Sequence, residues 1–145
     1  MNSKACLIFS MIFLLIFFVG CKSSSNVDRN GNGNGNGAIQ NPSFANDIQP
    51  IFTSGCALAG CHNAASASAG LVLDQGAAYA NIVNVASSQE PNLMLVLPSD
   101  ADNSYIVIKL EGRQNVGVRM PASGSITGTQ LQNIKNWINN GAQNN

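Results

Sequence analysis

Two cysteines and a histidine, Cys56, Cys61 and His62, lie within a span of seven residues. The chain contains no other histidine, and its remaining cysteines, Cys6 and Cys21, lie within or directly after an apolar N-terminal stretch. Thiols and imidazoles are the side chains that form disulfides, bind soft metal ions and hold prosthetic groups. One short segment therefore carries this chemistry for the folded part of the chain.

A cysteine pair followed directly by histidine is typical of the covalent attachment of a c-type haem. The thiols bond to the porphyrin, and the adjacent imidazole binds the iron. Cys61-His62 has the usual form, but four residues (57–60) separate the cysteines here where two are usual. Gly55 and Gly60 can supply the backbone angles that a longer loop needs. We expect one covalent haem c, held by both thiols, with the imidazole on its iron.

Two other uses of the same residues compete with this interpretation. In an oxidising compartment, Cys56 and Cys61 could form a short-loop disulfide without any cofactor. These residues do not favour a zinc site, because the two cysteines and His62 give only three ligands, at a spacing that fits no common structural zinc site. The disulfide thus remains the main alternative to haem attachment.

A second axial ligand for the iron has two candidates after the N-terminal stretch, Met94 and Met120. Met94 lies in the continuous apolar run 93–97, which predicts a buried side chain that serves packing. Met120 lies in a polar, glycine-rich loop, where a thioether has little packing value. We therefore expect Met120 to be the ligand opposite His62.

Ligation by histidine and methionine leaves the iron without an open position and raises its reduction potential. This combination predicts a one-electron carrier and argues against an enzyme. Arg113 and Arg119 are candidates to contact the haem propionates, with solvated loop arginines as the alternative.

The N-terminal stretch resembles a bacterial lipoprotein signal. Lys4 precedes an apolar run (5–19) too short to span a membrane comfortably, and Gly20 directly precedes Cys21. The resemblance implies removal of residues 1–20, lipidation of Cys21 and export. Lys22, by analogy with other lipoproteins, favours the outer membrane, with the domain in the periplasm or at the cell surface. An uncleaved membrane anchor is the alternative.

The rest of the chain divides into a linker and one domain. Residues 21–41 are rich in serine, asparagine and glycine and predict a flexible linker. Residues 42–145 are long enough for one small core, to which a large apolar cofactor would contribute. The formal net charge is zero, and no basic cluster points to nucleic acid.

Hydrophobic periodicity and capping residues predict an all-α domain. The expected helices are one capped by Asn46 or Asp47 and ending at Gly55, one from Asp74 to about 84, one over 105–110 after Ser104, and one after Thr127 ending at Gly141. Thr127 and Gln130 form a capping-box pattern. Residues 71–73 and 93–97 are expected to be extended, and Tyr79, Tyr105 and Trp137 to lie in the core.

The order of these features resembles a class I cytochrome c domain. The segments that carry the resemblance are 44–52, 56–62, 70–73, 103–110, Arg119-Met120-Pro121 and 137–142. It implies thioethers at Cys56 and Cys61, His62 as proximal ligand and Met120 as distal ligand. It further implies that the helices carrying Phe52 and Trp137 cross around the haem.

These observations predict a membrane-anchored monohaem cytochrome, monomeric, that exchanges single electrons with redox partner proteins. Two alternatives remain open. One is a haem enzyme or sensor in which Met120 dissociates from the iron. The other is a haem-free envelope lipoprotein with a Cys56–Cys61 disulfide.

Overall fold

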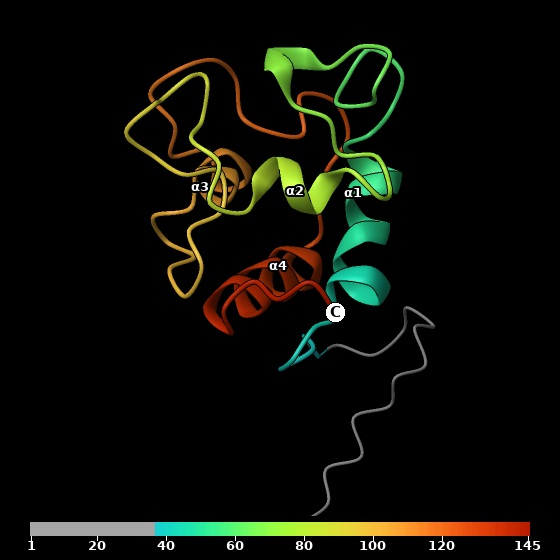
Figure 1. The fold of residues 1–145 in the computed structure, drawn as a ribbon, viewed down its shortest axis with the longest axis vertical. Helices are drawn as coiled ribbons and strands as arrows, with labels where there is room; N and C mark the ends of the chain where they lie inside the picture. The colour runs from blue at the N-terminus through green and yellow to red at the C-terminus, as the bar shows by residue number, and fades with distance from the viewer. Residues whose placement is uncertain (1–36) are drawn as a thin grey trace, which may run out of the picture. The chain divides into compact units, whose positions relative to one another are not determined.

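The computed structural model describes residues 37–145, so the expected signal (1–20), Cys21 and most of the expected linker lie outside the described residues. The elements in chain order are η1 (Phe44–Ile48), α1 (Gln49–Gly55), η2 (Ser68–Gly70), α2 (Ala78–Ile82), α3 (Tyr105–Glu111) and α4 (Gly128–Asn139) (Figure 1). Over residues 37–145 the regular structure is helical, with isolated β-bridges and no strand. None of these helices is long and apolar enough to cross a bilayer.

The first helix begins earlier than the sequence predicts. Ser43 is its N-cap, and the Ser43 hydroxyl accepts from the backbone N–H of Asn46 at 3.4 Å. Asp47 Oδ2 accepts in turn from the Ser43 N–H at 2.7 Å. Asn46 and Asp47 therefore lie inside η1 and do not cap it, because a serine one turn earlier satisfies the free N–H groups. α1 follows directly and ends, as predicted, at Gly55.

The second predicted helix is much shorter than its sequence pattern suggests. α2 begins at Ala78, and the Asp74 carboxylate accepts from the backbone N–H of Ala64 at 2.7 Å instead of capping it. A side chain bonded across the fold is not available to the helix N-terminus. Asp74 thus ties the segment after the cysteine motif to the start of this turn region.

The third and fourth helices lie where the sequence predicts them. Ser104 precedes α3, but its hydroxyl donates to the Asp100 carbonyl at 2.7 Å and accepts from the Leu97 N–H at 2.9 Å, without capping the helix. α4 begins with the complete capping box of Thr127 and Gln130. Local side-chain to backbone bonds therefore set the start of α4, whereas Ser104 fastens the preceding loop.

The apolar run 93–97 is extended but is not uniformly buried. Val96 is fully buried and bridges to Val83, whereas Met94 is 36% exposed. A bend at Leu95 interrupts the segment, so Met94 and Val96, which would share a face in a regular strand, lie in different environments. The prediction that Met94 is a core side chain is therefore wrong.

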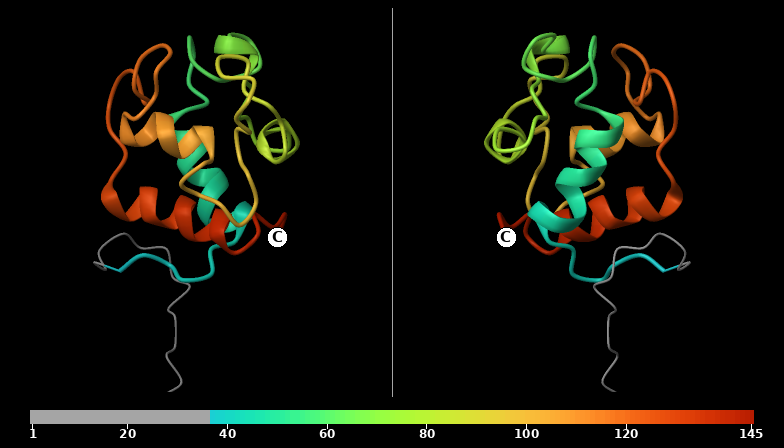
Figure 2. Two further views of the ribbon diagram at one scale, coloured as in Figure 1. Left: turned by 90° about the vertical axis from the view of Figure 1, so that its left-hand side faces the viewer. Right: turned by 90° about the vertical axis from the view of Figure 1, so that its right-hand side faces the viewer.

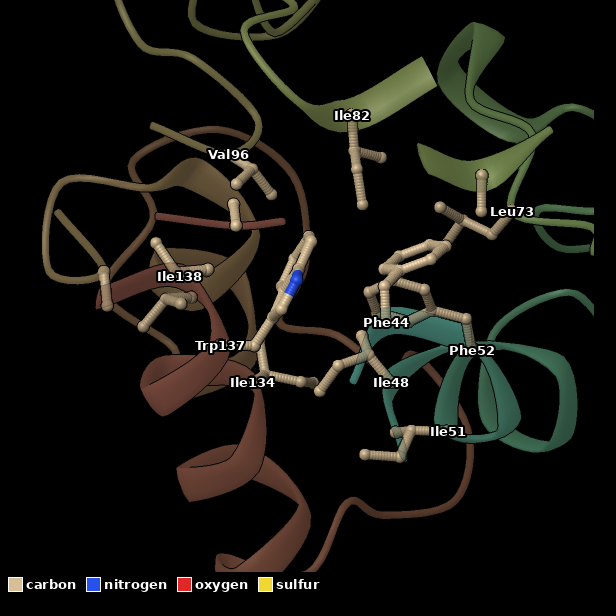
Figure 3. Packing of buried hydrophobic residues seen from close by; sticks show 14 of the residues in the cluster. Phe44, Ile48, Ile51, Phe52, Leu73, Ile82, Val96, Ile134, Trp137 and Ile138 are labelled. Atoms are coloured by element: carbon tan, nitrogen blue, oxygen red, sulfur yellow. The ribbon is translucent and has the colours of Figure 1, made fainter. Parts of the chain in front are cut away.

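An aromatic cluster joins the N- and C-terminal helices. The Phe44 ring lies 5.2 Å from both the Trp137 and Tyr79 rings, centroid to centroid, and 6.4 Å from the Phe52 ring. Figure 3 shows Trp137 on α4 facing Phe44 and Phe52, and the views in Figure 2 show α4 crossing the end of the first helix at η1. The Trp137 N–H and Tyr79 hydroxyl donate to carbonyls of the C-terminal tail at 2.9 Å each. The buried rings therefore leave no polar group unpaired.

Residues 39–41, which we call the strap, belong to the domain although the sequence assigns them to the flexible linker. Asn133 Oδ1 accepts from the Ile39 N–H at 2.8 Å, and Asn136 donates to the Ile39 carbonyl at 2.7 Å. Asn140 donates to the Gln40 carbonyl at 2.8 Å. The strap runs along α4 in Figure 2. Asn133, Asn136 and the C-cap Asn140 lie three and four residues apart, on one face of α4. Their side chains hydrogen-bond to the backbone of a segment whose composition alone predicts a linker.

Candidate functional site

One cavity of about 540 Å³ is bordered by Cys56, Cys61, His62 and Met120, the residues that the sequence predicts to bind the porphyrin and its iron, but not by the candidate arginines. Its volume lies within the roughly 300–1,000 Å³ typical of small-molecule and cofactor sites. Much of its wall is aliphatic, from Leu71, Leu73, Val85, Leu95, Ile106, Leu110, Ile126 and Ile134. The fold thus brings Cys56 and Met120, which are 64 positions apart, to one largely apolar space.

The cysteine motif forms a compact loop at the end of α1. The Cys56 N–H continues the helix by donating to the Phe52 carbonyl at 2.8 Å, and the His62 N–H closes the loop on the Cys56 carbonyl at 3.1 Å. Gly60 has φ +81°, the left-handed backbone that glycine adopts without strain. Leu58 is 44% exposed, so the extra residues project outward. Gly55 is an ordinary helical residue, so of the two glycines only Gly60 adopts a left-handed backbone.

Both cysteines are free thiols and half-buried at the cavity wall. Burial, with a smaller contribution from neighbouring Cys61, raises the pKa of the Cys56 thiol to about 11. A neutral thiol is the form that a desolvated, apolar site favours. Cys56 therefore stays protonated at neutral pH.

The His62 ring is oriented by a backbone carbonyl. Its Nδ1 lies 3.1 Å from the carbonyl oxygen of Ser68 in η2. A carbonyl only accepts, so this hydrogen bond requires the proton on Nδ1, and in the neutral ring Nε2 then has a free lone pair. Fixing the tautomer in this way is the usual support of a metal-binding histidine. The ring is therefore prepared to bind a metal through Nε2.

Met120 borders the same cavity from the loop after α3. It is half-buried, packs against the core, and its N–H donates to the Lys109 carbonyl at 3.0 Å. Met94 does not line this cavity. Of the two methionines, the structure brings only Met120 to the cysteines and the histidine.

Neither candidate arginine lies at the cavity wall. Arg119 is exposed, and its Nε donates to the Leu110 carbonyl at 3.0 Å. Arg113 pairs with Glu111 at 2.6 Å and donates to the Asp102 carbonyl at 3.1 Å. These contacts anchor the loop on α3 and give the two guanidinium groups a structural role.

A polar corner of the cavity was missed by the sequence prediction. Lys109, Tyr105 and Gln89 all line it, and Lys109 is only 6% exposed. Lys109 Nζ donates to Gln89 Oε1 and to the Val116 carbonyl, each at 3.0 Å. One sequence signal could have revealed this polar corner: Lys109 follows Tyr105 by four residues, which places both side chains on one face of a largely apolar helix.

The residues at this cavity fit a covalently held haem in donor chemistry and in size. Two thiols, an imidazole with free Nε2 and a thioether are the groups that such a cofactor uses, and the aliphatic walls suit a flat apolar ring. Among residues 37–145, no three or more His, Cys, Asp or Glu side chains are grouped to bind a metal ion directly.

Comparisons with known proteins found no relative of this chain. No protein-family model matches the chain, and neither a curated protein nor a solved structure matches it. The interpretation of this cavity therefore rests on its own residues and their geometry.

Proposed function

We propose that this protein is a membrane-anchored monohaem c-type cytochrome that carries single electrons in the periplasm or cell envelope. The observation that carries the proposal is the convergence of Cys56, Cys61, His62 and Met120 on one cavity of about 540 Å³. Under this proposal the helical fold is a cytochrome c-like domain in which the crossed terminal helices support the haem. Lipidation of Cys21 would anchor the exported chain, with the outer membrane as the favoured site.

The two thiols would hold the cofactor covalently. Each thiol adds across one vinyl group: a sulfur–carbon bond forms at one vinyl carbon, the thiol proton ends on the other, and no oxidant or reductant is consumed. Cys56 and Cys61 are both free and border the cavity, as this addition requires. Covalent attachment would keep the cofactor in a domain with little interior of its own.

His62 and Met120 would bind the iron. The Ser68 carbonyl accepts from Nδ1 of the His62 ring, which in its neutral form would offer Nε2 to the iron, and the Lys109 carbonyl holds the Met120 backbone. When bound, the haem supplies a reversible one-electron change at its iron. With both axial positions taken by protein ligands, the iron would have no position for oxygen or peroxide, and the aliphatic wall would keep water from the ring. The arrangement therefore favours electron transfer over catalysis. Redox partner proteins would supply and accept the electron.

Met120→Ala tests the ligand assignment, with Met94→Ala as the matched control. The full chain is produced in a host that matures c-type cytochromes, and haem is detected by peroxidase staining after denaturing electrophoresis. Both variants should retain covalent haem. Met120→Ala should lose the low-spin ferric spectrum and lower the reduction potential, because a thioether ligand stabilises ferrous iron. Met94→Ala should match the wild type.

Two results would contradict the proposal in different ways. A wild-type chain that carries no covalent haem after maturation would favour the haem-free lipoprotein with a Cys56–Cys61 disulfide. A haem-bearing Met120→Ala protein with an unchanged spectrum and potential would remove Met120 as the distal ligand. An enzyme or sensor would instead bind carbon monoxide readily in the wild-type ferrous form.

A further inference from the structure

Lys109 is a buried cation at the wall of the haem cavity. It is 6% exposed, and across residues 37–145 the ion pairs formed by side chains involve Arg113 and Lys135 but not Lys109. Its hydrogen-bond partners, Gln89 Oε1 and the Val116 carbonyl, are both neutral. Burial accordingly lowers the pKa of this amine. Burying this amine therefore carries a desolvation cost that no salt bridge among residues 37–145 offsets.

The surroundings of Lys109 are closely fitted to the ammonium group. The Tyr105 hydroxyl donates to the same Gln89 oxygen at 3.3 Å, and the Tyr105 ring centroid lies 5.7 Å from Lys109 Nζ. The loop closes over the amine at Gly117, where a Cβ would lie 3.1 Å from Nζ and φ is +71°. The Lys109 amine is thus held by two other segments of the chain, at Gln89 and at residues 116–117, and by Tyr105 on its own helix.

A buried ammonium group beside a ligand-sized cavity favours an anionic group on the ligand. Lysines that are almost fully buried are normally paired, and two neutral acceptors leave the third N–H of the ammonium free. The same corner supplies the side-chain N–H groups of Gln89 as further donors, while the Tyr105 hydroxyl donates to Gln89 Oε1 and so helps to hold that amide in place.

We propose that Lys109, supported by Gln89 and Tyr105, binds a carboxylate of the cavity's ligand and so fixes how the ligand is turned in the cavity. This inference rests on the proposed function, under which the carboxylate belongs to the porphyrin rim. It replaces the expected arginine partners, because Arg113 and Arg119 lie away from the cavity wall. A free anion such as phosphate would have the same chemistry, and the test separates the two.

The test uses the full matured chain carrying haem labelled with ¹³C at its carboxyl carbons, read by reduced-minus-oxidised infrared difference spectra. Lys109→Met should shift the labelled carboxylate bands, and Lys109→Arg should keep them close to the wild type. Lys135→Met is the control, since that lysine pairs with Asp102 and Glu111 and does not line the cavity. If Lys109→Met does not fold, Lys109→Gln removes the charge while keeping a hydrogen-bond donor, and the same shift is expected.

Two results would overturn the inference. Haem-loaded Lys109→Met or Lys109→Gln with the same labelled bands as Lys135→Met would show that Lys109 does not contact the porphyrin carboxylate. Inorganic phosphate that changes the wild-type reduction potential at constant ionic strength, but not that of Lys109→Met, would assign the lysine to a free anion. A wild-type chain without any covalent haem would instead refute the proposed function, which this experiment detects separately.

Discussion

The aromatic cluster and the cavity are the two halves of one small domain, and they are built differently. In the first, Phe44, Tyr79 and Trp137 fill the space between helices with rings as close as 5.2 Å. In the second, short helices and loops surround about 540 Å³ that side chains leave open. Protein interiors are otherwise close-packed, so the first half supplies its own packing whereas the second depends on what it binds.

Removing the central ring of the aromatic half should have the largest effect on stability. Trp137 is 1% exposed and contacts Phe44 and Tyr79, so Trp137→Ala should lower the free energy of unfolding by about 3–5 kcal/mol. Denaturant unfolding of the matured protein measures this. Trp137→Phe is the control, because it keeps a ring and loses chiefly the hydrogen bond to the Gln143 carbonyl. A loss of equal size in both variants would show that the hydrogen bond, and not the ring, is responsible.

Preventing attachment should loosen the cavity half selectively. In a Cys56→Ala, Cys61→Ala double variant, amides of the cavity-wall segments 85–89 and 120–126 should exchange at least about tenfold faster than in the haem-loaded chain, equivalent to about 1.4 kcal/mol. Amides around Trp137 in α4 should change less, because the Trp137 ring packs against Phe44 and Tyr79, and none of these three residues lines the cavity. Native-state hydrogen exchange gives both values. Equal acceleration in α4 would show that the two halves open as one unit and that the comparison is wrong.

The sequence predicts best where structure is local. The Thr127–Gln130 capping box sets the start of α4 from residues three apart, and the prediction is confirmed. It fails where a side chain has a distant partner: Asp74 bonds to Ala64 instead of capping α2, and Lys109 lies under a loop closed by Gly117. Such pairings depend on tertiary packing, which no local pattern contains.

The candidate site shows the same limit. The cysteine motif and Met120 could be proposed from residue type and loop context, and the structure places them at one cavity. Met94 was assigned to the core from its apolar neighbours, but a bend at Leu95 exposes it. Arg119 is a candidate haem contact by sequence, with a solvated loop arginine as the alternative, and in the structure its guanidinium donates to the Leu110 carbonyl of α3 and does not line the cavity. Adjacency in sequence does not fix which way a loop side chain points.

The strap offers a smaller test on the packed side of the molecule. Asn133→Ala removes the acceptor for the Ile39 N–H and should destabilise the protein by about 1 kcal/mol. Thr129→Ala is the control, because Thr129 is an exposed residue of α4; Gln132 is unsuitable, since it bonds to Asn136, which itself holds the strap. Urea unfolding of both variants measures the difference. Equal stabilities would mean that the strap does not contribute to the fold and that residues 39–41 act as linker after all.

The smallest expected effect lies at the seam between the halves, where Lys135 on α4 reaches α3 and the loop before it. Its Nζ donates to Asp102 Oδ1 at 2.9 Å and Glu111 Oε1 at 3.0 Å. The hydrogen bond from Lys135 lowers the pKa of the Asp102 carboxyl. Burial alone would raise the pKa of Glu111, but the hydrogen bonds from Lys135 and Arg113 outweigh burial, so the pKa of Glu111 is lowered. The hydrogen bond to Asp102 is the largest cause of a raised pKa at Lys135, and the hydrogen bond to Glu111 is the second largest.

These directions define a pH window. Depressed carboxyl pKa values stabilise the fold above the ordinary values of 3.8 and 4.5, and this contribution is lost as pH falls through the folded pKa values. The raised lysine pKa stabilises it below 10.5 and is lost as pH rises through the folded value. The stability difference between the wild type and Lys135→Met should therefore be constant from about pH 5 to 10 and shrink outside that range. It should be small throughout, because the Asp102 side chain is 78% exposed and solvent screens the pair. A difference that grows below pH 4 would show that the carboxyls gain nothing from Lys135, leaving apolar packing as the link between the two halves.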